Sequence, residues 1–319
     1  MANEERKKIL EVEHLAMHFS TGRGKKKSVV KAINDVSFHV YESETFGLVG
    51  ESGCGKTTTG RALIRLYNPT SGSVKFDGRE LTGPMTNDLR KYITSNMGMI
   101  FQDPIDSLNP RFTIREIISE GLKIRGIKDE KELDDRVYEM LDKVGLTKEH
   151  ATRYPHEFSG GQRQRIGIAR TIITRPRLVI ADEPVSALDV SIQAQVINLL
   201  NELKEEMGLT IIFIAHDLSV VKYFSDRIGV MYYGKLVEVA DSEELYKHPI
   251  HPYTRALLSA VPQPNPLTER KRVRLVYEPE KAHDYSKEQP QMTEVFPGHF
   301  VYASPSEVEA YRKEFADRL

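Results

Sequence analysis

Apolar residues along this chain follow two patterns, short runs that suit strands and longer stretches with helical spacing. The short runs are bounded by Gly, Asn, Asp or Ser and lie at residues 9–19, 29–41, 45–50, 97–101, 177–181, 210–215 and 227–240. The helical stretches lie between them, at residues 56–66, 111–125, 130–144, 161–173, 190–207 and 218–224. Strands that alternate with helices predict an α/β fold with a mostly parallel core sheet and crossover helices.

Three regions depart from this alternation. The first two apolar runs flank a Gly/Lys-rich tip, TGRGKKKS, which predicts a hairpin and an N-terminal antiparallel subsheet. Residues 111–157 show helical spacing without a strand, so we expect a helical insert there. After residue 248 the chain is rich in proline up to residue 266, and a charged stretch at 269–274 and a polar tail follow. This change of character predicts an appended C-terminal region.

Composition narrows the class of protein. The 319 residues include 45 Lys and Arg against 46 Asp and Glu, a net charge of −1 that argues against a chain devoted to binding DNA or RNA. Cys54 is the single cysteine, so no disulfide forms within the chain and a reducing compartment is expected. No apolar run approaches the roughly 18 to 20 residues of a membrane span, and no export signal is recognisable. We therefore expect a cytosolic globular protein.

A phosphate-binding loop is the strongest chemical signal. Residues 50–57 fit the pattern G-x-x-x-x-G-K-[ST] between an apolar strand, TFGLV, and a helix, TTTGRALIRL. Glycines let backbone N–H groups curl around phosphates, and the helix N-terminus adds about half a positive charge. Lys56 would reach the β- and γ-phosphates, and Thr57 would ligate Mg²⁺. The predicted nucleotide-binding residues are Gly50, Glu51, Ser52, Gly53, Cys54, Gly55, Lys56, Thr57 and Thr58.

The alternative for this loop is a glycine-rich turn that arose by chance. The bare pattern should arise in about one chain in a hundred of this size, and the strand–loop–helix setting makes chance rarer still. The functional interpretation is therefore favoured. Within it, Cys54 is interpreted as a small loop residue rather than a catalytic thiol.

Polar residues follow three further apolar strands. Asp182 and Glu183 end the run LVIA; Asp182 would hold Mg²⁺ through water, and Glu183 would polarise the attacking water as a general base. Gln102 follows GMIF and could touch Mg²⁺ and that water, and His216 follows TIIFIA and could align the γ-phosphate with Glu183. Each residue alone suits an ordinary strand end. Because ligands of open α/β sheets bind at the carboxyl ends of strands, together they predict a catalytic site made by Glu183, His216 and Gln102.

A second anion site precedes another helix, QRQRIGIARTII. Ser159, Gly160, Gly161 and Gln162 place a serine and two flexible glycines at its N-terminus, which is more than one chain needs for one phosphate. Here the sequence resembles the ATP-binding cassette (ABC) ATPases. The segment FSGGQ matches the family signature LSGGQ, with Phe158 in place of leucine.

The order of the other motifs extends the resemblance over residues 9 to about 248. They are Walker A at 50–57, the Q-loop at Gln102, Walker B at 178–183, the D-loop through Asp189 and the switch histidine His216. In this family two cassettes pair head to tail, so the resemblance implies that residues 159–162 and Asp189 serve the nucleotide site shared with a partner. It also implies that Phe19 stacks on adenine, although a core position would suit Phe19 equally.

The C-terminal region makes the resemblance more specific. Residues 251–262, HPYTRALLSAVP, are similar to the C-terminal element of ATPase subunits from bacterial oligopeptide and dipeptide importers, most of all the F-type subunit of oligopeptide permeases. A proline-rich linker is the alternative. The resemblance implies a nucleotide-binding domain at 1–248, with a helical subdomain at about 103–160, and an extension at 249–319. Many relatives carry a cysteine cluster in this tail that is thought to hold an iron–sulfur centre, and the lack of cysteine here excludes a cysteine-ligated one.

The implied function is ATP hydrolysis that drives oligopeptide uptake, with ATP and Mg²⁺ bound. The implied partners are a second ABC ATPase in a mixed pair, two membrane permease subunits and an extracytoplasmic peptide-binding protein, without nucleic acid. The chain would lie peripherally at the cytoplasmic face of a bacterial cell membrane. Dipeptides, nickel or another small solute stay open as the cargo.

Three other classes compete with this interpretation. A cassette protein acting on DNA would need long coiled coils, and one acting on ribosomes would carry two cassettes in one chain. A GTP switch protein would show an Asn-Lys-x-Asp motif after a strand, and none occurs. A pure interaction subunit with a degenerate ATP site is disfavoured because Glu183 is present.

Overall fold

The computed structural model describes residues 6–21, 28–103, 107–261 and 272–315. The tip of the expected N-terminal hairpin and part of the proline-rich stretch lie outside these ranges. The chain divides into two compact units. The first comprises Met1–Lys7, Tyr41–Ser43 and Gly83–Ile214, and the second comprises Lys8–Val40, Glu44–Thr82 and Ala215–Leu319.

Three parallel strands form the centre of the first unit. They are β6 (Met97–Ile100), β7 (Leu178–Asp182) and β8 (Thr210–Ala215). β7 lies in the middle, because Leu178 pairs with Met97 on one side and with Thr210 on the other. Every residue of β7 and β8 is buried, as expected for parallel strands that are covered on both faces. The strands predicted at 97–101, 177–181 and 210–215 are confirmed.

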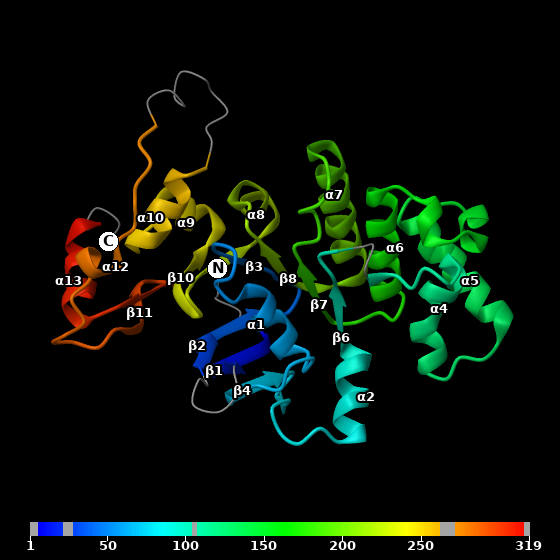
Figure 1. Ribbon diagram of the computed structural model, residues 1–319, viewed down its shortest axis with the longest axis horizontal. Coiled ribbons are helices and arrows are strands. Elements are labelled where there is room, and N and C mark those ends of the chain that lie inside the picture. The colour runs from blue at the N-terminus through cyan, green and yellow to red at the C-terminus, as the bar shows by residue number, and fades with distance from the viewer. Residues whose placement is uncertain (1–5, 22–27, 104–106, 262–271, 316–319) are drawn as a thin grey trace. The chain divides into compact units, whose positions relative to one another are not determined.

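Helices make up most of the rest of the first unit. Two short 3₁₀ turns accompany them, η2 (Lys148–Thr152) and η3 (Pro155–Glu157). The α-helices are α2 (Asn87–Asn96), α4 (Ile114–Ile124), α5 (Glu130–Lys143), α6 (Gly160–Ile172) and α7 (Val190–Met207). α4 packs against both α5 and α6, which confirms the predicted helical insert (Figure 1). α2 was not predicted from sequence, because only Leu89 and Ile93 of its ten residues are buried.

The second unit contains an N-terminal sheet with the order β2-β1-β4-β5. Its strands are β1 (Lys8–Thr21), β2 (Ser28–Tyr41), β4 (Ser71–Phe76) and β5 (Arg79–Glu80). β4 pairs antiparallel with β1, with Val12 opposite Val74 and Leu10 opposite Phe76, and all four side chains are buried. An N-terminal antiparallel subsheet is therefore confirmed. β4 itself was missed, because only two residues of SGSVKF are buried.

A second set of strands in this unit holds the phosphate loop. β3 (Thr45–Val49) pairs in parallel with β9 (Arg227–Tyr232), and β9 pairs antiparallel with β10 (Lys235–Asp241). The apolar run at 227–240 is therefore two strands rather than one. The chain turns at Tyr233 and Gly234, whose φ values of 42° and 78° reverse its direction. The helices that accompany these strands are α1 (Lys56–Leu63), α8 (Leu218–Phe224), α9 (Ser242–Lys247) and α10 (Pro252–Ser259).

The C-terminal region continues these strands. β12 (His299–Ala303) pairs with β10 and with β11 (Gln291–Phe296), and α12 (Pro279–Ala282) and α13 (Pro305–Glu314) flank the hairpin. α13 packs against β11 (Figure 1). A small apolar cluster holds these elements together, formed by Ile250, Val295, Phe296, Val301, Ala303, Val308 and Tyr311. The C-terminal region, whose sequence predicts only a polar tail, therefore has a core of its own.

No helix in the described part of the chain is long and apolar enough to cross a membrane.

Candidate functional site

The phosphate loop lies in the second unit, between a fully buried β3 and the N-terminus of α1. Gly50 and Gly55 adopt φ values of 150° and 110°, conformations that disfavour other residues. A Cβ atom at Gly50 would lie 2.2 Å from the carbonyl oxygen of Met231, and one at Gly55 would lie 2.3 Å from that of Ala32. The loop backbone is therefore packed too closely for side chains at both positions. The N-cap residue of α1 is Gly55, which has no side chain to cap the helix, and an uncapped helix N-terminus favours an anion.

Lys56 is folded back along this loop. Its ammonium group donates hydrogen bonds to the carbonyl oxygens of Gly50 at 2.7 Å and Glu51 at 3.0 Å, and the residue is only 4% exposed. A buried cation is costly unless it is paired, and the two carbonyl groups meet part of that cost. The arrangement holds a positive charge beside the uncapped helix start, where an anion is favoured.

The remaining loop residues differ in their exposure to solvent. Cys54 is buried, and burial raises the pKa of its thiol, so the thiolate that a nucleophile requires is disfavoured. Thr57 and Thr58 are half-buried at the start of α1, while Ser52 and Gly53 are exposed. Phe19, on β1, is half-buried and meets the ring of Tyr67 edge-on, with the ring centroids 5.6 Å apart. Its stacking on adenine stays a prediction.

The acidic pair lies in the first unit, at the end of β7. Asp182 is fully buried, and Glu183 follows with a φ of 45°. The Glu183 backbone N–H donates to the carbonyl oxygen of Ile214 at 2.9 Å, and its carbonyl oxygen accepts from the hydroxyl of Ser186 at 3.1 Å. These contacts hold Glu183 in a conformation that is unusual for a residue other than glycine, a feature common at functional sites.

Gln102 contacts the side chain of Glu183. The Gln102 amide Nε2 donates to Oε2 of Glu183 at 3.1 Å across 81 positions of sequence. Gln102 follows β6 and Glu183 follows β7, two neighbouring parallel strands whose carboxyl ends meet at one edge. The structure thus brings together two of the three residues predicted to be catalytic. The third, His216, follows β8 and is exposed.

The signature segment is the N-terminus of α6 in the first unit. The Ser159 hydroxyl accepts from the N–H of Gln162 at 3.3 Å, and the Gln162 side chain accepts from the N–H of Ser159 at 3.0 Å. This reciprocal pair is a capping box. A Cβ atom at Gly161 would lie 2.6 Å from a methyl group of Ile192 on α7, so the glycine allows the two helices to approach. Asp189 is exposed at the start of α7.

A contact between the phosphate loop and α10 is not predicted by the sequence. The phenol oxygen of Tyr253 accepts a hydrogen bond from the N–H of Glu51 at 3.2 Å, and Tyr253 is 2% exposed. The two residues are 202 positions apart, so no local pattern could have joined them. The HPY segment indicates a family resemblance but does not indicate this contact.

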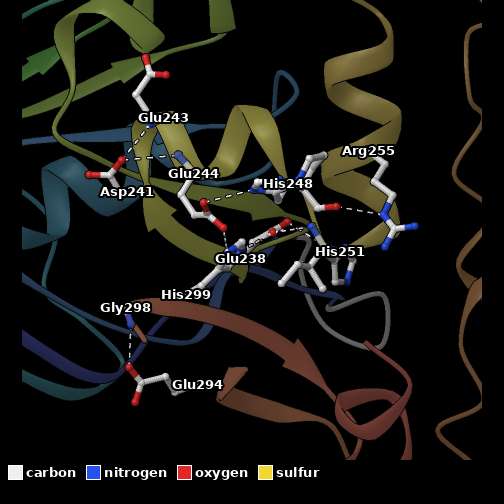
Figure 2. A network of polar contacts seen from close by, with 12 residues as sticks. Glu238, Asp241, Glu243, Glu244, His248, His251, Arg255, Glu294, Gly298 and His299 are labelled. Carbon is white, nitrogen blue, oxygen red and sulfur yellow. Dashed lines mark hydrogen bonds and ion pairs between the residues drawn. The ribbon is translucent and has the colours of Figure 1, made fainter. Parts of the chain in front are cut away.

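A buried carboxylate lies next to this contact. Glu238, on β10, accepts hydrogen bonds from the backbone N–H groups of Ile250 at 2.7 Å and His251 at 3.1 Å, and from Nε2 of His299 at 2.7 Å (Figure 2). Glu238 is fully buried and His299 is 1% exposed. These three donors offset the free-energy cost of burying the Glu238 carboxylate.

Comparisons with known proteins fit these motifs. The model of the family "ABC transporter" matches residues 33–186, and the model of the "Oligopeptide/dipeptide transporter, C-terminal region" matches residues 237–287. The chain is 57% identical over 305 residues to the oligopeptide transport ATP-binding protein OppF of Bacillus subtilis (strain 168), covering 95% of this chain and 99% of that protein. It is 53% identical over 312 residues to the dipeptide transport ATP-binding protein DppF of Lactococcus lactis subsp. cremoris (strain MG1363), covering 97% of this chain and 98% of that protein.

A solved structure supports the same fold. It is the dimeric structure of an ATP-binding cassette in a post-hydrolysis state, bound to ADP and Pi. It covers 73% of this chain and 98% of its own, with 28% identity and a TM-score of 0.66.

Proposed function

Because this chain belongs to the ATP-binding subunits of the ABC transporter family, we propose that it hydrolyses ATP to drive the uptake of oligopeptides. The observation that carries the proposal is the phosphate loop. Its backbone is packed too closely for side chains at Gly50 and Gly55, α1 starts without a side-chain cap, and Lys56 lies along the loop. These features fit a polyphosphate, because N–H donors and a cation converge on one short segment.

The loop residues would bind the nucleotide. The N–H groups at the start of α1 donate to phosphate oxygens, and Lys56 neutralises charge on the β- and γ-phosphates. Mg²⁺, when bound, would offset the charge that develops during phosphoryl transfer. Thr57, Asp182 and Gln102 are the residues proposed to hold it, with oxygen donors of the kind this ion prefers.

Glu183 is the proposed general base. It accepts a hydrogen bond from Gln102, which orients the carboxylate, and its own backbone is fixed through Ile214 and Ser186. A carboxylate held in this way can take a proton from the attacking water. His216 is proposed to align the γ-phosphate with Glu183.

A second cassette would complete the ATP site. The Ser159 hydroxyl uses its oxygen to accept from Gln162, and this leaves its O–H able to donate to a phosphate held by the partner chain. The cassette of similar structure is dimeric, which supports a second ATPase subunit here. We propose a mixed pair of subunits, with Gly160, Gly161 and Asp189 also facing the shared nucleotide.

The remaining partners follow from the importer role. Two membrane permease subunits would bind this chain at the cytoplasmic face of the membrane, and an extracytoplasmic binding protein would deliver the peptide. ATP would draw the two cassettes together, and hydrolysis would let them part. The permease subunits would follow this cycle.

A strain that lacks this chain provides the test. Uptake of labelled tri- to hexapeptides should be lost, be restored by the wild-type chain, and not be restored by Glu183→Gln at equal abundance. Restored uptake with Glu183→Gln would refute hydrolysis by this chain as the driving step.

Dipeptides are a second candidate cargo, because a dipeptide transport subunit is 53% identical. The same strains should be assayed with labelled dipeptides and with nickel. Loss of dipeptide or nickel uptake with intact oligopeptide uptake would reassign the cargo and keep the ATPase function.

A further inference from the structure

One loop residue joins Lys56 to the C-terminal region. Glu51 accepts a hydrogen bond from the Lys56 ammonium through its carbonyl group, and it donates one to the Tyr253 phenol through its N–H. Its backbone is therefore held on one side by the cation of the loop and on the other by α10. All three residues belong to the second unit.

Tyr253 itself is held firmly. Its ring lies 4.4 Å from that of Tyr232 on β9 and 5.5 Å from that of Tyr277, measured between centroids. Its backbone N–H donates to Nδ1 of His251, which caps the start of α10. Burial raises the pKa of the Tyr253 phenol, so the group stays neutral at physiological pH. A buried, immobile phenol is a rigid acceptor for the N–H of Glu51.

The hydrogen bonds of Glu238 connect the start of α10 to the C-terminal region. Glu238 binds the two residues that precede Pro252, and through His299 it also binds the first residue of β12 (Figure 2). The Arg255 guanidinium, one turn along α10, pairs with Glu314 at the end of α13. The start of α10 is thus fixed to the C-terminal hairpin and helix.

From these contacts we infer that Tyr253 is a positioning residue for the phosphate loop, and that the C-terminal region supports nucleotide binding through it. The inference rests on the proposed function. A loop with glycines at Gly50, Gly53 and Gly55 has much conformational freedom to lose when it closes on a ligand. A contact that fixes the loop beforehand lowers that cost, so it strengthens binding of the triphosphate.

Tyr253→Phe tests this, because it removes only the hydroxyl group. We expect the Kd of the full-length chain for MgATP to rise about three- to tenfold, as for the loss of one net hydrogen bond. The turnover rate at saturating ATP should change by less than about twofold, since Tyr253 acts through the loop and touches no reacting atom. The Glu51 amide signal in a ¹⁵N spectrum should shift upfield as its hydrogen bond to protein is lost.

Tyr277→Phe is the matched control. It removes a hydroxyl group from the same aromatic cluster, but this hydroxyl group makes no hydrogen bond to the phosphate loop among the described residues. Its Kd for MgATP and its Glu51 signal should match those of the wild type. An unchanged Kd in Tyr253→Phe, or an equal rise in both variants, would overturn the inference.

Glu238→Gln tests whether the contacts of Glu238 at the start of α10 also strengthen MgATP binding. This variant is the decisive one if Tyr253→Phe lowers the melting temperature by several degrees. A neutral amide in place of the carboxylate weakens three hydrogen bonds at the start of α10. We expect a two- to fivefold rise in the Kd for MgATP, and a Kd equal to that of the wild type would refute support from the tail. Failure of the wild-type chain to bind MgATP would instead refute the proposed function.

Discussion

Two helix N-termini carry the glycine-rich motifs of this chain, and they are built in opposite ways. α1 begins at Gly55, which has a φ of 110° and provides no side-chain cap. α6 begins at Ser159, whose capping box with Gln162 satisfies N–H groups at both ends of the first turn. The first helix start therefore has no side-chain cap, whereas the second has a reciprocal one.

The difference shows what makes a helix N-terminus an anion site. Both segments are identified as anion sites from their sequence, because glycines precede a helix in each. Only at α1 does the backbone geometry withhold a cap and place a lysine alongside. At α6 the capping box uses the N–H groups of Ser159 and Gln162, and the O–H of Ser159 can still donate to a partner. Substitutions at the start of α1 and at the start of α6 should therefore have different effects on MgATP binding, hydrolysis and stability.

The largest effect is expected at the open helix start. Lys56→Ala should weaken MgATP binding by about a hundredfold, because it removes charge-assisted hydrogen bonds to phosphate worth about 1.5–3 kcal/mol each. Titration with a fluorescent ATP analogue measures this. Lys235→Ala is the control, because it removes a lysine of the same unit that contacts Tyr302 instead of the loop. The Lys235 ammonium group lies 4.5 Å from the ring centroid of Tyr302. Equal affinity of Lys56→Ala and the wild type for MgATP would refute nucleotide binding by the phosphate loop.

Glycine replacement should separate the two starts by stability. Gly55→Ala forces a Cβ atom to 2.3 Å from the carbonyl oxygen of Ala32 at a positive φ, and should lower the free energy of unfolding by about 2–4 kcal/mol. Gly160→Ala meets its nearest atom at 3.7 Å, in Leu188, and should change that free energy by less than about 1 kcal/mol. Urea unfolding of both variants measures the two free energies. Similar losses would show that the two backbones are not built differently.

Removal of the cap at α6 should cost less and should leave nucleotide binding alone. Ser159→Ala should lower the free energy of unfolding by about 1 kcal/mol, as for other N-cap serines. The chain should still bind MgATP, while hydrolysis by the paired ATPase should fall at least about tenfold. Ser304→Ala removes the equivalent capping box of α13 and should cost similar stability with normal hydrolysis. Normal hydrolysis in Ser159→Ala would contradict a role for the signature serine.

The start of α10 has a cap that is lost when His251 is protonated at low pH. Burial, and the nearby His283 and Arg255, lower the pKa of His251 to about 3, and its Nδ1 caps α10 as an acceptor. The unfolded chain binds this proton near pH 6.5 and the folded chain does not, so stability falls as pH drops from about 6.5, by at most about 1.4 kcal/mol per pH unit for this group.

Replacement by asparagine keeps an acceptor without a titrating ring. His251→Asn should therefore flatten the dependence of the melting temperature on pH between about pH 6.5 and 4. Some slope should persist, because burial also lowers the pKa of His39 to about 4. An unchanged slope would show that the cap does not titrate as described.

The sequence predicted those parts of the fold that repeat a local pattern. Fully apolar strands such as β7 and β8 and the loop at 50–57 are written in consecutive residues, so both were found. β4 was missed because its burial alternates within a polar segment. The hairpin of β11 and β12 was missed because its core includes Ile250, far from it in sequence.

Direct contacts between distant residues are harder to predict. The strand-end pattern predicts that Gln102 and Glu183 belong to one site, but their hydrogen bond follows only from the pairing of β6 with β7. Tyr253 and Glu51 meet because β3 pairs with β9 in one unit and α10 follows β10. The sequence names such residues but does not show which of them touch.

Hydrolysis by Glu183→Gln shows whether this chain binds ATP at its phosphate loop and cleaves it with its own base. We expect the variant to bind MgATP as tightly as the wild type while its hydrolysis rate falls at least about a hundredfold. The paired ATPase should then stay closed on ATP. A turnover rate equal to that of the wild type, with binding intact, would contradict the role of Glu183 as the general base.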